Sequence, residues 1–245
     1  TLAGRAVGIA DKLDNIVATF SRGLIPTGSQ DPYALRRQAL GIANILIAAG
    51  YHVSLAALTA AAMDLLGIAG EEQRAKLSED IQEFFRLRLK NILADEGVRY
   101  DMIDAILATA TDDIYDAWLR AKALAEGGGT VAMQRAVQAL IRAGNLAKNA
   151  VADAIDPNLL AADAERTLYE AYLRARRAIT ALLAERNYAG VLGVMADMAD
   201  PLDAFFNQVM VMVDDAAVKN NRLALLKAIA ALPSALADLT KITAI

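Results

Sequence analysis

Cysteine is absent from this 245-residue sequence, and histidine occurs once, at His52. Without cysteine there is no disulfide, no thiolate metal site and no cysteine nucleophile. A single histidine without a GxSxG motif gives no basis for a Ser-His-Asp triad or a histidine metal site, so His52 is interpreted as a loop residue. We expect no catalytic residue and no metal site in this chain, and a reducing cytoplasm as its compartment.

Long apolar runs and an excess of basic charge are also lacking. The most apolar run, residues 39–50, is interrupted by Asn44 and is too short to span a bilayer, and no signal-peptide pattern opens the chain. Because the first residue is Thr1, we interpret the sequence as part of a longer protein. The formal net charge of −4 disfavours a general nucleic-acid binder. We expect no membrane or DNA partner, and any RNA site must be local.

The residues that are present favour helices. Hydrophobic residues make up 56% of the chain and include many alanines, whereas aromatic residues make up 5%. This balance predicts an all-α helical bundle rather than a β-sandwich. Helical patterns cover residues 2–20, 33–49, 71–95, 100–109, 112–126 and 130–152, and another long helix lies within 158–188.

The segment from residue 200 to 232 carries the heaviest apolar stripes. Asp200 is expected to cap a helix with Pro201 at its first position, followed by a stripe from Leu202 through Phe205 and Phe206 to Val213. A second apolar helix follows. We therefore predict a helical hairpin packed into the core. The pairs Asp31-Pro32 and Asp156-Pro157 give the same helix-start signal.

Arg222 lies near the apolar side of the second helix of that hairpin. An unpaired buried charge is costly, so this arginine requires an anionic partner. We predict a structural ion pair with a carboxylate such as Asp214, Asp215 or Asp203.

Two further sets of cations have alternative interpretations. Arg36 and Arg37 lie in the first turns of a helix, where a cation needs a carboxylate or another anion, so both a salt bridge and an RNA contact are consistent with them. Between Thr130 and Ala150 there are three basic residues and no acidic residue. The face of this helix opposite its apolar side is either an ordinary solvated face or an RNA-binding surface; its polar side chains are Arg135, Gln138, Arg142, Asn145 and Asn149.

Several stretches resemble, in the same order, the β subunit of bacterial glycyl-tRNA synthetase. They are ADKLD at residues 10–14, GLIPTGSQDPYALRRQALGI at 23–42, FFRLRLKNILADEGVRYDMIDAILA at 84–108, ERNYAGVLGVMADMADP at 185–201, and DAFFNQVMVM followed by KNNRLALLKAI near the C-terminal end. The resemblance implies that residues 1–68 are the end of an HD-like helical region with connecting helices. Residues 69–245 would form an anticodon-binding domain of the DALR type.

The resemblance also implies a function and partners. The chain would recognise tRNA(Gly) in a heterotetramer, while a separate α subunit uses ATP to activate glycine, so that this chain needs no cofactor. In DALR-type domains the helix that matches residues 130–152 carries a Lys-Arg…Asn…Lys pattern, in which Ile141 replaces the first lysine. The candidate tRNA-binding residues are Arg135, Arg142, Asn145, Lys148, Lys219, Asn221 and Lys227.

Two other interpretations were weighed. Asp11 matches the last aspartate of an HD-type metal site, but the histidine and His-Asp partners of such a site are missing, so Asp11 is interpreted as a surface or capping group. A non-catalytic helical scaffold for protein interactions, without nucleic acid, also fits the acidic pI of about 5.1 and the low aromatic content.

Overall fold

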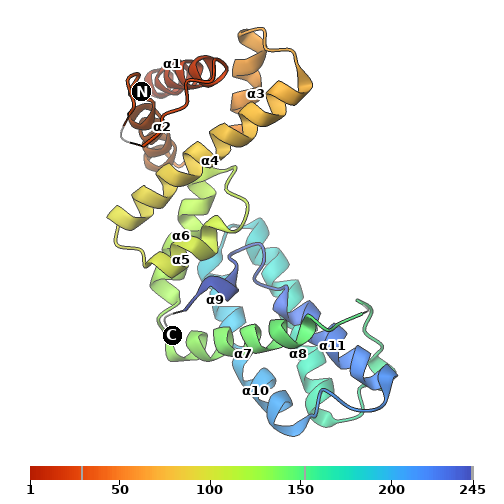
Figure 1. Cartoon of the computed structure of the whole chain (residues 1–245). Coiled ribbons are helices and arrows are strands. Elements are labelled where there is room, and N and C mark those ends of the chain that lie inside the picture. The colour runs from red at the N-terminus through yellow and green to blue at the C-terminus, as the bar shows by residue number, and fades with distance from the viewer. Residues whose placement is uncertain (29, 152, 244–245) are drawn as a thin grey trace. The chain divides into compact units, whose positions relative to one another are not determined.

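The computed structural model describes residues 1–28, 30–151 and 153–243, and this part of the chain is helical without any β-strand. The all-α prediction is confirmed (Figure 1). The helices are α1 (Leu2–Phe20), α2 (Leu35–Ala49), α3 (Leu55–Leu65), α4 (Glu71–Asp95), α5 (Tyr100–Leu107), α6 (Ile114–Gly127), α7 (Val131–Ala147), α8 (Asp163–Ala184), α9 (Tyr188–Ala196), α10 (Ala199–Gln208) and α11 (Ala216–Ala230), with two short 3₁₀ helices, η1 (Pro157–Leu159) and η2 (Leu239–Lys241).

The helices divide into two compact units. Unit 1 comprises residues 1–103 and 110–121, and unit 2 comprises residues 104–109 and 122–245. The expected division between residues 68 and 69 falls inside unit 1. The reason is that α4, which begins at Glu71, packs against α1, α2 and α3 and so belongs with the N-terminal helices.

Unit 1 has its core between α4 and the first two helices. Ile16, Val17 and Ile42 are fully buried, as are Ile81 and Leu93 of α4. The Phe20 and Phe84 rings meet edge to face, with their centroids 5.1 Å apart. These contacts fix one face of α4 against α1 and α2, and they place Arg88 of α4 at the same boundary.

Unit 2 is built around α7. This helix packs against α9, α10 and α11, while α8 packs against α9 and α10. Figure 1 shows α7 beside α11 in unit 2. Phe205 of α10 and Leu226 and Ile229 of α11 are fully buried. A Cβ built on Gly144 of α7 would lie 3.6 Å from Cβ of Ala230, so these two helices approach closely at small residues.

The predicted hairpin differs from the observed arrangement. Its first helix ends at Gln208, and Val209 is already extended, so the apolar stripe does not continue to Val213 as a helix. The principal contacts of α10 are with α7 and α8, and those of α11 are with α7. Both helices are packed into the core as predicted, but they are organised around α7, whose apolar face they share.

The three Asp-Pro pairs do not begin α-helices at the predicted positions. Asp31 accepts the backbone N–H groups of Leu35 and Arg36 across a turn, at 2.8 and 3.0 Å, and α2 begins only at Leu35. Asp156 caps the 3₁₀ helix η1 rather than α8. Asp200 lies inside the first turn of α10, whose N-cap position is Met198. A carboxylate before proline satisfies backbone amides in turns as well as in helices, so the signal does not select the α-helix.

None of the helices in the described part of the chain is long and apolar enough to cross a membrane.

Candidate nucleic-acid interface

Helix α7 is bounded by Thr130 at its N-cap and Lys148 at its C-cap. The Thr130 hydroxyl accepts a hydrogen bond from the backbone N–H of Met133 at 3.2 Å, which satisfies one of the free amides of the first turn. The helix ends at Ala147, with Lys148 at the C-cap. It is therefore shorter than the predicted range of 130–152, and Val151, expected on its apolar face, is exposed.

The two faces of α7 are separated as the 3.6-residue period predicts. Met133, Val137 and Leu140 are buried against the neighbouring helices. The opposite face carries a row of exposed polar side chains, here called the α7 row: Arg135, Gln138, Arg142, Asn145 and Lys148. Arg135, Gln138, Arg142 and Asn145 lie on the surface as predicted, whereas Asn149, predicted on the same face, is exposed beyond the end of α7.

Arg135 is engaged by two carboxylates of α10. Its Nη2 donates to Asp203 Oδ2 at 2.6 Å and to Asp200 Oδ1 at 2.9 Å. The hydrogen bond to Asp203, followed by that to Asp200, raises the pKa of Arg135. The α7 row thus has no acidic residue of its own, but α10 supplies two at this end. Arg135 is locally neutralised.

Arg142 has a different neighbour on the same helix. Its guanidinium carbon lies 4.2 Å from the centroid of the half-buried Phe206 ring of α10. This is a cation–π contact, in which the ring face attracts the cation without taking up its N–H donors. The described part of the chain places no carboxylate within ion-pair distance of Arg142. Its charge is therefore held in position and left uncompensated.

Asn145 and Lys148 lie one turn apart at the end of α7. Lys148 Nζ donates to Asn145 Oδ1 at 3.0 Å. Both side chains are exposed. The bond orients the Asn145 amide so that its NH₂ group remains free to donate, beside a cation that is not paired with a carboxylate.

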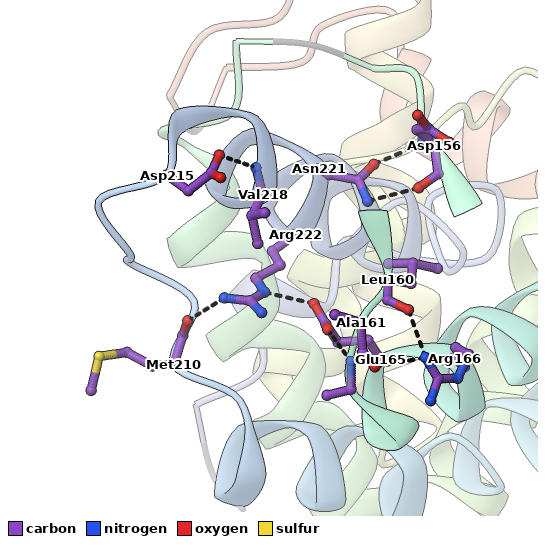
Figure 2. Close-up of polar contacts among 11 residues, drawn as sticks. Asp156, Leu160, Ala161, Glu165, Arg166, Met210, Asp215, Val218, Asn221 and Arg222 are labelled. Atoms are coloured by element: carbon purple, nitrogen blue, oxygen red, sulfur yellow. Dashed lines mark hydrogen bonds and ion pairs between the residues drawn. The ribbon is translucent and has the colours of Figure 1, made fainter. Parts of the chain in front are cut away.

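Asn221 is engaged within the protein. It is 5% exposed, its Oδ1 accepts from the Asp156 backbone N–H at 2.7 Å, and its Nδ2 donates to the Asp156 carbonyl at 3.0 Å (Figure 2). The amide therefore fixes the turn that precedes η1. Because both of its polar atoms are used, we do not retain Asn221 in the proposed interface.

Arg222 forms a structural ion pair, but not with the carboxylates predicted from the sequence. Its Nε donates to Glu165 Oε1 at 2.6 Å, and its Nη1 donates to the Met210 carbonyl at 2.9 Å (Figure 2). The expected pairing with Asp214, Asp215 or Asp203 is wrong, and Asp203 binds Arg135 instead. Asp215 is the N-cap of α11 and accepts from the Ala217 and Val218 amides, and Asp214 is exposed. A carboxylate that caps its own helix points away from side chains farther along it.

Glu165 is the buried member of this pair, with a side chain that has no exposed surface. Burial alone raises the pKa of Glu165, but the hydrogen bond from Arg222 and the bond from the Ala162 amide, 2.7 Å long, act against it. The net pKa of Glu165 lies below its ordinary value. The carboxylate is thus held ionised between α8 and α11.

The remaining candidates lie on α11. Lys227 Nζ is 2.6 Å from Asp153 Oδ1, in a pair whose members are both solvent-exposed. Lys219 is half-buried, and no ion pair of this residue occurs in the described part of the chain. Arg222 and Lys227 are therefore both compensated by carboxylates within the protein.

Two family models match the chain. Residues 1–108 match the model described as glycyl-tRNA synthetase beta subunit, and residues 132–245 match the DALR anticodon binding domain. The chain belongs to the glycyl-tRNA synthetase β-subunit family. The second match contains α8 to α11 and all of α7 except its first residue, including the α7 row.

Relatives match over nearly the whole chain. The glycine–tRNA ligase beta subunit of Desulforamulus reducens is 44% identical over 244 residues, that of Desulforudis audaxviator is 41% identical over 241, and that of Clostridioides difficile is 40% identical over 242. These alignments cover 98 to 99% of this chain and 35% of each relative. The chain thus spans about a third of the length of the curated relatives it matches.

Within the DALR-type domain, sequence reasoning missed the neighbours of the α7 row. Phe206 was assigned to the core together with Phe205, but only Phe205 is fully buried, and Phe206 supports Arg142. Asp200 was assigned to a cap, although it pairs with Arg135. The spacing of Asp200, Asp203 and Phe206 at intervals of three was the available signal, because it puts all three on one side of α10.

In the part of the chain that matches the β-subunit model, the two residues considered for a metal or catalytic site are surface groups. Asp11 is exposed on α1. His52 lies in the loop after α2, as predicted, and its Nδ1 is 2.8 Å from Asp113 Oδ2. Among the described residues there is no group of three or more His, Cys, Asp or Glu side chains with the geometry to hold a metal ion.

Proposed function

We propose that unit 2 recognises the anticodon arm of tRNA(Gly) through the α7 row. The observation that carries this proposal is the exposed Arg142 guanidinium, which is held over the Phe206 ring without a carboxylate partner. A cation fixed in this way loses little side-chain freedom when it meets a phosphate. The match of residues 132–245 to an anticodon-binding domain supports the same surface.

The last three side chains of the row suit different parts of an RNA. Arg142 presents a planar fork of N–H donors that matches two phosphate oxygens, whereas Lys148 supplies a point charge to the backbone. Asn145 carries no charge, and its free NH₂ group is of the kind that reads base edges in single-stranded loops. Phosphate contacts would thus position the arm, and the amide would discriminate between bases.

The chain matches about a third of the length of its relatives. We propose that the complete β subunit works in the cytoplasm with a separate α subunit, in a heterotetramer. In that assembly the α subunit activates glycine with ATP, and this chain contributes tRNA recognition without a cofactor of its own.

A binding titration tests the proposal. The chain is titrated with tRNA(Gly) and with the same tRNA altered only in its anticodon, at several salt concentrations. Arg142→Ala should weaken binding and reduce the salt slope by about one unit, because one phosphate contact is lost. Asn145→Ala should reduce the preference for the native anticodon more than the salt slope.

Arg174→Ala is the matched control. Arg174 is an exposed arginine of α8 in the same unit, with Glu170 3.9 Å away, so its loss changes the net charge equally. It should leave affinity and discrimination nearly unchanged. If tRNA(Gly) does not bind, or if Arg142→Ala and Arg174→Ala weaken binding equally, the α7 row is not the recognition surface. A scaffold for protein interactions then becomes the better description of unit 2.

A further inference from the structure

Unit 1 contains a buried arginine that is not balanced by an ion pair. Arg88 lies on the buried face of α4 and is 9% exposed. Its Nε and Nη1 atoms are enclosed and have no hydrogen-bond partner in the described part of the chain. Buried guanidinium groups are normally paired, because water no longer solvates their charge and donors. Arg88 departs from that rule at two nitrogens.

The one strong contact of the Arg88 head group is with an aromatic ring. Its guanidinium carbon lies 4.3 Å from the centroid of Phe84, one turn earlier on the same helix. This contact supports the plane of the guanidinium but satisfies none of its N–H groups, just as Phe206 supports Arg142. The arginine is therefore fixed in orientation and still lacks an acceptor.

The surroundings of Arg88 carry an excess of positive charge. Burial lowers the pKa of Arg88, the nearby Arg36 cation lowers it further, and Asp31 acts in the opposite direction. Both oxygens of Asp31 already accept backbone N–H groups at the start of α2, from Leu35 and Arg36. Arg36 itself donates from Nη2 to the Gly28 carbonyl at 2.7 Å, which is a neutral acceptor.

The start of α2 adds to this field. Its first turn contains no acidic residue, and the positive end of the helix dipole points towards the same region. Arg36 at the start of α2 and Arg88 of the adjacent α4 thus share the influence of one carboxylate, Asp31, whose two oxygens already accept backbone N–H groups. The sequence already indicated that Arg36 requires a carboxylate or another anion, and within the described residues it has no ion pair.

We propose that Arg36 and Arg88 form a binding site for a phosphate group on unit 1. Guanidinium groups match phosphate oxygens in pairs, and a doubly charged tetrahedral anion supplies acceptors to both arginines at once. The site lies on unit 1, outside the DALR-type domain, and does not depend on the anticodon function of unit 2. A phosphate of this kind is either a free ion or part of an RNA backbone.

Inorganic phosphate is the first probe. The chain is unfolded by heat or urea in increasing phosphate, with ionic strength held constant by chloride. Phosphate that binds only the folded state raises the midpoint by mass action. Wild type should be stabilised, whereas Arg88→Met and Arg36→Gln should each bind phosphate about tenfold more weakly. Arg37→Gln is the control, because it removes the same charge from an exposed neighbouring position on α2.

The second arm separates the two sources of the phosphate group. tRNA(Gly) is titrated onto wild type and Arg36→Gln, with and without inorganic phosphate. An RNA phosphate in the site predicts that free phosphate competes and that Arg36→Gln flattens the salt dependence by about one unit. If the site instead holds a free phosphate ion, phosphate should stabilise the folded wild type, and tRNA binding should be the same for wild type and Arg36→Gln. Both results support the site.

The proposal is overturned if phosphate stabilises wild type no more than chloride does and Arg36→Gln leaves tRNA binding unchanged. It is also overturned if Arg37→Gln has the same effect as Arg36→Gln, since the response would then reflect general charge. Circular dichroism checks that Arg88→Met is folded. If it is not, the comparison of Arg36→Gln with Arg37→Gln decides the question alone.

Discussion

Arg222 and Glu165 are joined by a 2.6 Å hydrogen bond between Nε and Oε1, although they lie 57 positions apart in the sequence. The Glu165 side chain has no exposed surface, and that of Arg222 is 12% exposed. The pair therefore links α8 to α11 inside unit 2. Because this ion pair is buried, removing one of its members should change the stability of the protein measurably.

We expect Glu165→Ala to lower the free energy of unfolding by about 3 to 5 kcal/mol, because it leaves the Arg222 charge without its partner in a buried position. Arg222→Met combined with Glu165→Ala should cost much less than the sum of the two single changes. Urea denaturation of the four proteins in this cycle measures the coupling. Glu170→Gln, an exposed carboxylate of the same helix, should change stability by no more than about 0.5 kcal/mol. Additive single effects would contradict a coupled pair.

The depressed pKa of Glu165 predicts a pH dependence of stability. A carboxylate whose folded pKa is below its unfolded pKa, about 4.3 for glutamate, stabilises the folded state fully above the unfolded value. That contribution is lost as the pH falls through the folded pKa, which lies below the unfolded value. Thermal midpoints measured from pH 7 to pH 3 should therefore fall more steeply for wild type than for Glu165→Gln. Parallel curves below pH 4 would show that Glu165 does not contribute.

Asn221 should be a stability residue rather than an RNA contact. Asn221→Ala removes both bonds to the Asp156 backbone and leaves a partly buried N–H and carbonyl unsatisfied, at a cost of about 1 to 3 kcal/mol. The adjacent Asn220 is half-exposed and serves as the control, with an expected change of about 0.5 kcal/mol or less. Equal losses for the two alanine variants in urea denaturation would argue against the clamp.

Phe205 and Phe206 should respond differently to truncation. Phe205→Ala is expected to cost about 3 to 5 kcal/mol, since this ring is fully buried. Phe206→Ala should cost less and should instead weaken tRNA(Gly) binding, because Arg142 loses the ring on which it lies. Measuring unfolding and tRNA affinity on both variants separates the roles. A Phe206→Ala protein with full affinity would show that this support is unnecessary.

The carboxylates beside Arg135 should restrain its contribution to RNA binding. In Asp200→Asn combined with Asp203→Asn, the guanidinium loses both anionic partners, and we expect tighter tRNA(Gly) binding with a salt slope about one unit steeper. The same double change in an Arg135→Ala background should have a smaller effect on the slope. An unchanged slope in the first comparison would place Arg135 outside the interface.

The helices could be predicted from the sequence where the apolar period is long and the caps are local. α1 and α4 have the expected bounds, and the exposed row on α7 follows from the 3.6-residue period alone. These features depend on neighbours within a few residues of each other. Periodicity contains enough information to place them.

Long-range pairings could not be predicted in this way. Arg222 had several acidic residues close to it in sequence, and the one that binds it, Glu165, lies on another helix. Arg135 faces Asp200 and Asp203 for the same reason, because the packing of α10 on α7 brings them together. The charge of a surface depends on every helix that borders it. The charge of the α7 surface therefore could not be predicted from the sequence of α7 alone.

The position of α7 at the centre of unit 2 also affects how easily the backbone beneath the proposed recognition surface opens. Amides of a helix packed against three others exchange with solvent only when the surrounding structure opens. The segment around Met210 and Met212, which is irregular and exposed, opens at much lower cost. The side chains of the α7 row thus project from a backbone that is protected by its neighbours. Binding through them requires little ordering of the chain, so the entropic cost falls mainly on the RNA.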